Sequence, residues 1–214
     1  MDRKLPVYLL IDSSGSMNGE PIHSVNEGLS AMMSALRQDP YALETVLLSL
    51  ITFDREVKEI FPLTAVEQVQ LEEIVPPKSG PTHLGEALKY MLTRYGKDIK
   101  KRELGSKGNF SPMLFIMTDG KPSDSQLFQE MSRKIKQFKF ASIIGCVAGP
   151  KAKKEYLQQF ADPVVSLESA DSSSFTAFFK WVSDSITAGS QSGGLDAAGA
   201  NRLPPPPAEV NIVI

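Results

Sequence analysis

The residues best suited to chemistry follow the first apolar run of the chain, where Leu9–Gly19 reads LLIDSSGSMNG. The apolar run stops at Asp12, and Ser14 and Ser16 follow two residues apart in a turn that two glycines make possible. A carboxylate beside hydroxyls in a tight loop suits a plain turn, a nucleophile with its neighbours, a phosphate cradle or a metal site. The other polar residues of the chain decide among these four.

Two further polar features lie at matching points later in the chain. Asp119 ends the apolar run Pro112–Thr118 as Asp12 ends the first run, and Thr82 lies between the turn Ser79–Pro81 and a helical pattern. Ligands of open parallel sheets bind beyond the carboxyl ends of the strands. We therefore expect both aspartates to lie at the same rim of a sheet, with the threonine close by.

These positions offer two carboxylates and three hydroxyls, all of them hard oxygen donors: Asp12, Ser14, Ser16, Thr82 and Asp119. Such a set suits Mg²⁺, with Mn²⁺ or Ca²⁺ as alternatives, better than zinc or copper. If the neutral hydroxyls are the direct ligands, the ion keeps a strong attraction for an incoming carboxylate. The predicted chemistry is capture of an acidic residue, and no residue is predicted to be catalytic.

An enzyme is the main alternative. A phosphohydrolase of the haloacid dehalogenase type also has an aspartate after its first strand, but it needs a second carboxylate where this chain has Ser14. A serine hydrolase needs a base beside a serine, and only His23 and His83 are available. The chain has neither a G-x-S-x-G elbow nor a phosphate-binding GxxxxGK[ST] loop. Taken singly, each of the five oxygen donors suits a turn or a helix cap, but their joint placement favours a metal site.

The polar residues near these motifs have simpler interpretations. Asp54 follows the second apolar run and could approach the rim, but a surface turn is the favoured expectation, and Asp124 is expected to cap the helix that follows it. His83 is expected to start a helix or to support the site, and Cys146 is expected to be an inert core thiol.

Six apolar runs bounded by turn-forming residues predict β-strands. Four are nearly continuous, as strands covered on both faces are, and span 5–11, 45–53, 112–118 and 140–148. The run 56–61 alternates as an edge strand does, and 163–167 is short. Helical periodicity fills 22–36, 84–95, 127–138 and 175–186. The alternation predicts an α/β fold: a doubly wound, mainly parallel sheet flanked by helices, with one antiparallel edge strand.

Composition limits the classes of partner and location. The chain has 214 residues, 42% of them hydrophobic, and its net charge of −2 does not favour nucleic acid or an anionic membrane. No apolar run approaches the ~20 residues of a membrane-spanning helix, and the N-terminal apolar segment is too short for a signal peptide. The single cysteine cannot form an internal disulfide, so a cytoplasmic location is expected.

The sequence divides into a domain, 1–188, and a tail, 189–214. The tail begins as a Gly/Ser/Ala-rich linker, continues through Pro204–Pro207 and reaches the β-forming Val210–Ile214. We expect the prolines to form a polyproline II spacer and the last residues to add to a sheet edge, their own or a partner's. The basic segment Lys97–Ser111 is expected to be a solvated loop.

The run from Asp12 to Ser16 is a D-x-S-x-S motif and resembles the signature of the von Willebrand factor A domain. Thr82 in SGPTHLGEAL and Asp119 in IMTDGKPSD match the remaining two elements of that signature, in the same order. The resemblance covers Leu5–Ile186 and implies a metal-ion-dependent adhesion site. It implies that the two serines and the threonine coordinate Mg²⁺, while the aspartates often act through water.

A narrower resemblance, over residues 5–22, 39–53 and 203–214, is to the bacterial tellurium-resistance proteins of the TerY type. It implies a partner-binding role in a stress-resistance or phospho-signalling complex, alongside a kinase-like protein and a protein phosphatase. The expected function is therefore a non-enzymatic module that binds an acidic residue of a protein partner through a divalent ion. A metal-dependent phosphohydrolase that uses the same residues is the alternative.

Overall fold

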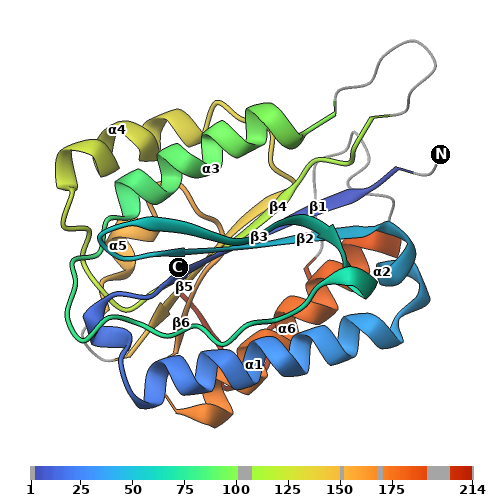
Figure 1. The fold of residues 1–214 in the computed structure, drawn as a ribbon, viewed down its shortest axis with the longest axis horizontal. Coiled ribbons are helices and arrows are strands. Elements are labelled where there is room, and N and C mark those ends of the chain that lie inside the picture. The colour runs from blue at the N-terminus through green and yellow to red at the C-terminus, as the bar shows by residue number, and fades with distance from the viewer. Residues whose placement is uncertain (1–2, 101–107, 150–151, 168–170, 192–202, 214) are drawn as a thin grey trace.

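The computed structural model describes residues 3–100, 108–149, 152–167, 171–191 and 203–213. Its centre is a seven-stranded sheet with the strand order β3-β2-β1-β4-β5-β6-β7 (Figure 1). The strands are β1 (Leu5–Asp12), β2 (Val46–Phe53), β3 (Val57–Ala65), β4 (Met113–Thr118), β5 (Ser142–Ala148), β6 (Val164–Leu167) and β7 (Asn211–Val213). The six predicted strands are confirmed, and β7 comes from the β-forming end of the tail.

The five strands from β2 to β6 in the sheet order run parallel, and both edge strands run antiparallel to their neighbours. The prediction of a mainly parallel sheet with an antiparallel edge strand is therefore confirmed by β3, and β7 adds a second antiparallel edge that was not counted. The strand β3 is longer than its alternating pattern suggested, and its pairing with β2 is irregular on either side of Leu50.

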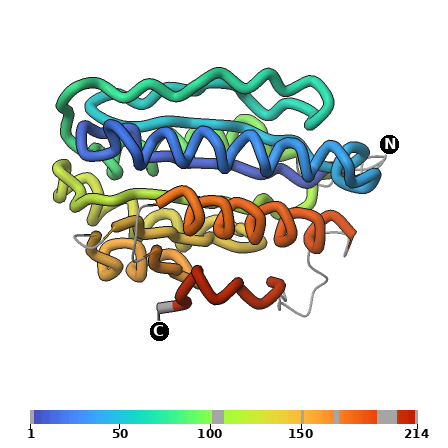
Figure 2. The backbone as a smooth tube through the Cα atoms, turned by 90° about the horizontal axis from the view of Figure 1, so that it is seen from below, coloured from blue at the N-terminus to red at the C-terminus, as the bar shows by residue number. Residues whose placement is uncertain are grey.

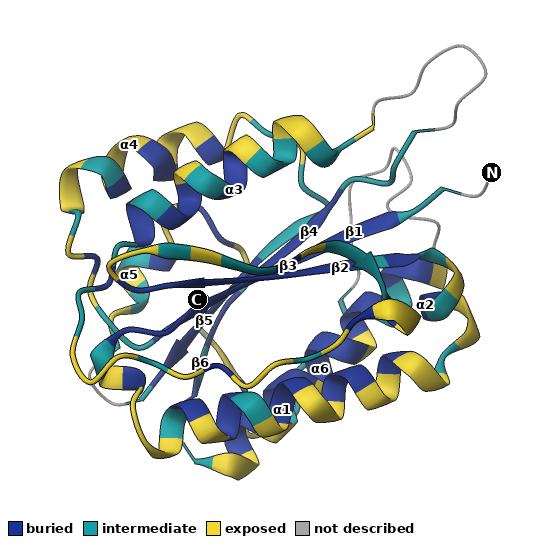
Figure 3. Ribbon diagram, viewed as in Figure 1, coloured by how far each residue is buried: buried dark blue, intermediate teal, exposed yellow. Residues whose placement is uncertain are grey.

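Helices cover both faces of the sheet (Figure 1). One face packs against α1 (Glu20–Gln38), α2 (Pro40–Thr45) and α6 (Ser172–Gln191), and the other against α3 (Leu84–Asp98), α4 (Ser125–Ile135) and α5 (Lys154–Leu157). The central strands are buried along their length while each long helix buries one side only (Figure 3). This explains why apolar residues run continuously through the strands but recur every three or four positions in the helices. None of the helices in the described ranges is long and apolar enough to cross a membrane.

The segments outside the repeating pattern differ from their expected form in two places. The helix α6 continues to Gln191, three residues past the expected end of the domain at 188. Residues 203–213 then lie beside α6 along one edge of the molecule (Figure 2). In the basic segment, α3 extends to Asp98, and the pair Lys100 and Asn109 is joined by backbone and side-chain hydrogen bonds. Residues 101–107 and 192–202 lie outside the described part of the chain.

The sheet order places a switch point at β1, which lies between β2 and β4. The chain leaves β1 through α1, on one face, and enters β4 from α3, on the other face. The parallel register pairs Ile11 with Met117, so Asp12 and Thr118 end neighbouring strands side by side. Loops from both strands therefore open at the same rim, where open α/β sheets bind their ligands.

Candidate metal centre

The first loop of the site is held in place by its backbone. The Ser13 amide donates to the Phe53 carbonyl at 2.8 Å, and the buried Met17 anchors the short helix η1 (Gly15–Met17) to the core. A Cβ on Gly15 would lie 2.7 Å from Cα of Ser79, so only glycine lets these two loops approach this closely. The first loop thereby packs directly against the loop that leads to Thr82.

Asp12 is fully buried and lies under the first loop. Its Oδ1 accepts a hydrogen bond from the Ser14 amide at 2.8 Å, and its Oδ2 accepts one from Oγ1 of Thr118 at 2.6 Å. Burial raises the pKa of the Asp12 carboxyl to about 6, although the hydrogen bonds from Thr118 and Ser14 lower it, and the nearby charge of Asp119 adds to the rise. The carboxylate is therefore held in one orientation, but its charge is poorly solvated.

The hydroxyls form a chain between the two predicted aspartates. Oγ of Ser14 lies 3.2 Å from Oγ of Ser16, which donates to Oδ1 of Asp119 at 2.9 Å. Burial raises the pKa of Asp119, and the hydrogen bond from Ser16 partly lowers it. Ser14 is buried and Ser16 is exposed, so the chain of oxygens leads from the interior to the surface.

Thr82 lies across the site from the serines. Its Oγ1 would be 3.2 Å from a Cβ on Gly120, which places the hydroxyl directly beside the loop that follows Asp119. The two loops are tied together, because the Thr82 amide donates to Oγ of Ser123 and the Ser123 amide donates to the Thr82 carbonyl, at 3.2 and 2.8 Å. The structure thus gathers all five predicted oxygen donors at the carboxyl ends of β1 and β4.

The donor set fits a divalent cation. Within the described ranges, neither Asp12 nor Asp119 forms an ion pair with a lysine, arginine or histidine. In the same part of the chain, no group of three His, Cys, Asp or Glu side chains is placed to hold a metal ion. A metal at this rim would therefore rely on the hydroxyl oxygens, as the sequence predicts. That the five side chains are its ligands stays a prediction.

Asp54 is a supporting residue for which the sequence interpretation favoured the wrong one of two places. It was expected in a surface turn, but it is buried, with 8% of its surface exposed, at the end of β2. Its Oδ1 accepts from the Glu56 amide at 2.9 Å, its Oδ2 from Oγ of Ser13 at 3.4 Å, and its carbonyl from the His83 amide at 2.9 Å. Asp54 therefore connects the loops of Ser13 and of Thr82. The sequence pattern did not predict the burial of Asp54, because the alternation of β3 carries no information about the turn between β2 and β3.

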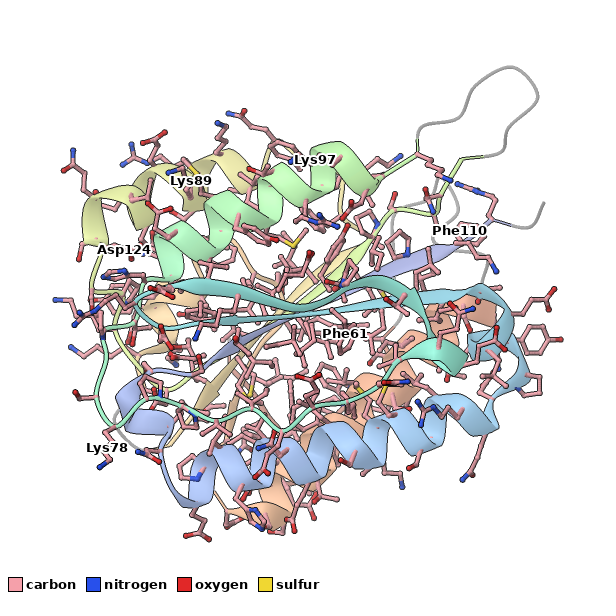
Figure 4. All side chains as sticks on the ribbon, viewed as in Figure 1. Phe61, Lys78, Lys89, Lys97, Phe110 and Asp124 are labelled. Carbon is pink, nitrogen blue, oxygen red and sulfur yellow. The ribbon has the colours of Figure 1, made fainter. Side chains whose placement is uncertain are left out.

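Asp124 has a different partner from the one predicted. Its carbonyl accepts the first hydrogen bond of α4, from the Phe128 amide, but its side chain makes no cap within α4. The carboxylate instead accepts from the amides of Gly85 and Glu86, at 3.1 and 2.8 Å, in the first turn of α3. Asp124 thus stabilises the helix that follows Thr82. Lys78 and Asp124 mark two of the site loops in Figure 4.

The remaining expectations concern His83 and Cys146. His83 is the N-cap residue of α3, directly before Leu84, and its Nδ1 lies 3.1 Å from the Arg55 carbonyl oxygen. His23 lies on the surface of α1, 3.3 Å from Glu27. Among the described residues, neither histidine is hydrogen-bonded to a serine of the site, so the triad of a serine hydrolase does not form. Cys146 is buried, and burial raises the pKa of its thiol.

The chain is thus an open α/β domain that gathers loop hydroxyls and aspartates at the switch point of its sheet. The model of the von Willebrand factor type A domain matches residues 7–181, and the chain belongs to this family. Domains of the family typically bind their partners through a metal-ion-dependent adhesion site. None of the curated proteins compared with the chain matches it.

Solved structures share the fold. The pilus adhesin SpaC of Lactobacillus rhamnosus GG superposes with a TM-score of 0.68 at 14% identity, over 87% of this chain and 30% of the adhesin. Proximal thread matrix protein 1 from the mussel byssus gives 0.63 at 21%, over 86% of this chain and 47% of that protein. In another structure of the mussel protein, with a TM-score of 0.59, zinc occupies the metal-ion-dependent adhesion site. This chain spans less than half the length of each of these proteins.

Proposed function

We propose that this domain is a non-enzymatic module that binds a protein partner through a divalent ion, with Mg²⁺ as the ion. The buried carboxylate of Asp12, which has no ion-pair partner among the described residues and lies beside the chain of hydroxyls from Ser14 to Asp119, is the observation that carries the proposal. A buried carboxylate without a cation is costly, and a bound cation removes that cost. Ser14, Ser16 and Thr82 would hold the ion directly, and Asp12 and Asp119 would act mainly through water.

The protein's own residues position the site for capture of a carboxylate. A divalent ion held mostly by neutral oxygens would supply a strong attraction for an anionic oxygen. Asp12 is oriented by Thr118 and the Ser14 amide, so it is ready to accept hydrogen bonds from water. Ser16 is exposed, and it marks the side from which an acidic residue of the partner would approach.

The finer proposal is a role of the TerY type: an adaptor in a tellurite- or stress-resistance complex of the cytoplasm. Its support is the sequence resemblance over residues 5–22, 39–53 and 203–214. A kinase-like protein and a protein phosphatase are the partners that this resemblance proposes, and neither nucleic acid nor a membrane is among them.

The decisive experiment is a pull-down from a lysate of the source cell, with and without a chelator. We expect partners that bind the wild type in Mg²⁺ to be lost with the chelator and with Asp12→Ala. Glu130→Ala, which removes an exposed carboxylate from α4, is the matched control and should retain them. Binding that is equal with and without chelator would contradict a metal-mediated contact.

The enzyme alternative needs a separate assay. The second carboxylate of a phosphohydrolase is missing at Ser14, and this favours the adaptor. Turnover of a generic phosphomonoester in Mg²⁺ should stay at the level of a buffer blank. Hydrolysis by the wild type that is lost in Asp12→Ala would contradict the adaptor proposal and support the phosphohydrolase alternative.

A further inference from the structure

Residues 203–213 are held on the domain by a small set of separate contacts. The indole nitrogen Nε1 of Trp181, on α6, donates a hydrogen bond to the Pro204 carbonyl at 2.8 Å. Val210 is 2% exposed and belongs to the same core cluster as α1 and α6. The strand β7 then pairs with the outer edge of β6, antiparallel, over three residues. The three contacts come in sequence order: the hydrogen bond at Pro204, the buried side chain of Val210 and the strand pairing of β7.

The first contact has the chemistry of proline-rich peptide recognition. Pro204–Pro207 has no backbone amide hydrogens, so these residues cannot donate to a helix or a strand ladder, while their carbonyls can still accept. Aromatic side chains on a groove recognise such peptides in the polyproline II conformation. Trp181 supplies the indole here, with its ring centroid 6.2 Å from that of Phe178. Trp181 is 2% exposed with the segment in place, and without the segment its indole N–H would exchange the Pro204 carbonyl for water.

The last contact is strand addition. The register pairs Val164 with Val213, Val165 with Ile212 and Ser166 with Asn211. An exposed sheet edge is a template for an extended peptide, which gains backbone hydrogen bonds there while a buried side chain gives specificity. Val210 provides that side chain, and the Val210 amide donates to the Pro207 carbonyl at 3.0 Å, in the turn that separates the prolines from the strand.

The geometry points to a peptide-docking surface, made of the Trp181 side of α6 and the outer edge of β6, which we propose also accepts the 203–213 segment of a second copy of this chain. The surface complements this segment in each of its three contacts, and a second copy carries the identical segment. Eleven residues, 192–202, separate the end of α6 from the segment in the sequence. Exchange of such a segment between copies replaces each contact with the same contact, so it costs little beyond the joining of two chains.

The surface can be tested with a synthetic peptide of residues 203–214 and the emission of Trp181, which is the only tryptophan of the chain. The receptor is the full chain with Val210→Asp, which weakens its own segment. A segment tethered by a short linker has an effective concentration of about 1 mM, so the peptide should bind with a Kd below about 1 mM. We expect a saturable change in emission, at least tenfold weaker binding by a Val210→Asp peptide, and a weaker response from the wild-type chain.

A second variant, Ile212→Pro, serves as the receptor in case Val210→Asp fails to fold. Ile212→Pro removes a backbone amide from β7 at a side chain that is 48% exposed, so the core is spared. Glu209→Ala, at an exposed neighbouring position, is the matched control and should respond as the wild type does. No change in emission up to several millimolar peptide, in a receptor that melts cooperatively, would overturn the docking surface.

Light scattering of the full chain tests whether a second copy supplies the docked segment. We expect a dimer to appear as the wild-type concentration rises towards the millimolar range, and to be lost with Val210→Asp or Ile212→Pro but not with Glu209→Ala. If the peptide binds and the wild type stays monomeric over that range, the second copy is excluded as the occupant. A dimer that both tail variants retain would also contradict the exchange.

Discussion

The Asp12 carboxylate is fully buried, and the described residues supply two hydrogen bonds to it but no positive charge. Burial without a counter-charge explains why its pKa rises to about 6 even though Thr118 and Ser14 oppose the rise. The same property that destabilises the metal-free protein makes the position receptive to a cation. The proposed function would therefore link the stability of the domain to ion binding through this one residue.

Replacing Asp12 with asparagine should stabilise the metal-free protein at pH 7.5. The pKa of about 6, against 3.8 for an ordinary aspartate, corresponds to about 3 kcal/mol of destabilisation, at about 1.36 kcal/mol per unit. An asparagine has only one side-chain oxygen, so if it keeps the hydrogen bond from the Ser14 amide it cannot accept the one from Thr118. The loss of that bond reduces the gain in stability by about 1 kcal/mol. We expect urea unfolding in EDTA to show a net gain of about 2 kcal/mol for Asp12→Asn, and no further gain on adding Mg²⁺. Asp184→Asn, at an exposed site on α6, should change neither value, whereas a destabilised Asp12→Asn would contradict the assigned cause.

Asp54 supports the site without being one of its predicted ligands. Asp54→Ala removes the acceptor for the Glu56 amide and for Oγ of Ser13, so the two loops lose a common anchor. Loss of such a supporting group typically weakens metal binding by about 10–100-fold. We expect titration calorimetry with Mg²⁺ or Mn²⁺ to show a loss in that range for Asp54→Ala and less than a threefold loss for Asp54→Asn, which keeps one acceptor. Equal affinity in all three proteins would mean that Asp54 serves the turn alone.

At the scale of elements, the close approach of α3 and α4 decides how Thr82 is presented. A Cβ on Gly85 would lie 2.5 Å from the Phe128 amide nitrogen and 2.7 Å from Oδ2 of Asp124, so the two helix starts fit together only at a glycine. Asp124 uses this approach to cap α3 from the start of α4. The two helices therefore fix the loops of Thr82 and Asp119 relative to each other.

Asp124→Ala should destabilise the first turn of α3, although Asp124 lies outside that helix. Removal of a capping carboxylate costs about 0.5–2 kcal/mol of unfolding free energy. We expect urea unfolding to show a loss of about 1–2 kcal/mol, and hydrogen exchange to speed up at the amides of Gly85 and Glu86. Asp124→Asn should lose about half as much, and Glu130→Ala on the same helix should stay within about 0.5 kcal/mol of the wild type. Unchanged exchange at Gly85 and Glu86 would contradict the cap.

Sequence patterns predict these elements well where burial is repetitive. Apolar runs predicted the six strands, most of which are buried on both faces of the sheet. Apolar residues spaced by three and four predicted the long helices, which are buried on one side. The strand end at Asp12 and the parallel order were enough to place both aspartates at one rim. The partner of Asp124 and the burial of Asp54 depend on how separate elements meet, and local sequence carries no trace of that. The β-forming end of the tail predicted a strand at a sheet edge, but which edge it joins, that of β6, also depends on how separate elements meet.

At the scale of the whole molecule, the rim and the tail-docking surface occupy different parts of the sheet. The rim lies where β1 and β4 end, and β7 is the third strand beyond β4 in the sheet order. The two proposed contacts, one through an ion at the loops and one with a peptide at the sheet edge, would therefore not compete for the same surface. Removing the metal should leave exchange of the 203–213 segment unchanged, because these contacts involve none of the site residues.

The pH dependence of stability should reverse in sign when the ion is bound. The pKa of Asp12 in the metal-free fold, about 6, lies above its ordinary value of 3.8, so folding favours the protonated carboxyl. Its contribution to the unfolding free energy is fully present below about pH 4 and is lost as pH rises through about 6. Burial raises the pKa of Asp119 in the same direction.

A divalent ion competes with the protons on these carboxyls, so it stabilises the fold most above pH 6. At 100-fold excess over its Kd the ion adds about 2.7 kcal/mol. We expect melting temperatures in Mg²⁺ and in EDTA to differ clearly at pH 8 and to converge by about pH 5. Asp12→Asn should show almost no difference at either pH. A difference in melting temperature that stays constant from pH 5 to pH 8 in the wild type would show that the ion binds elsewhere. A site built on Asp12 and Asp119, whose pKa values are raised, should lose its ion to protons in that range.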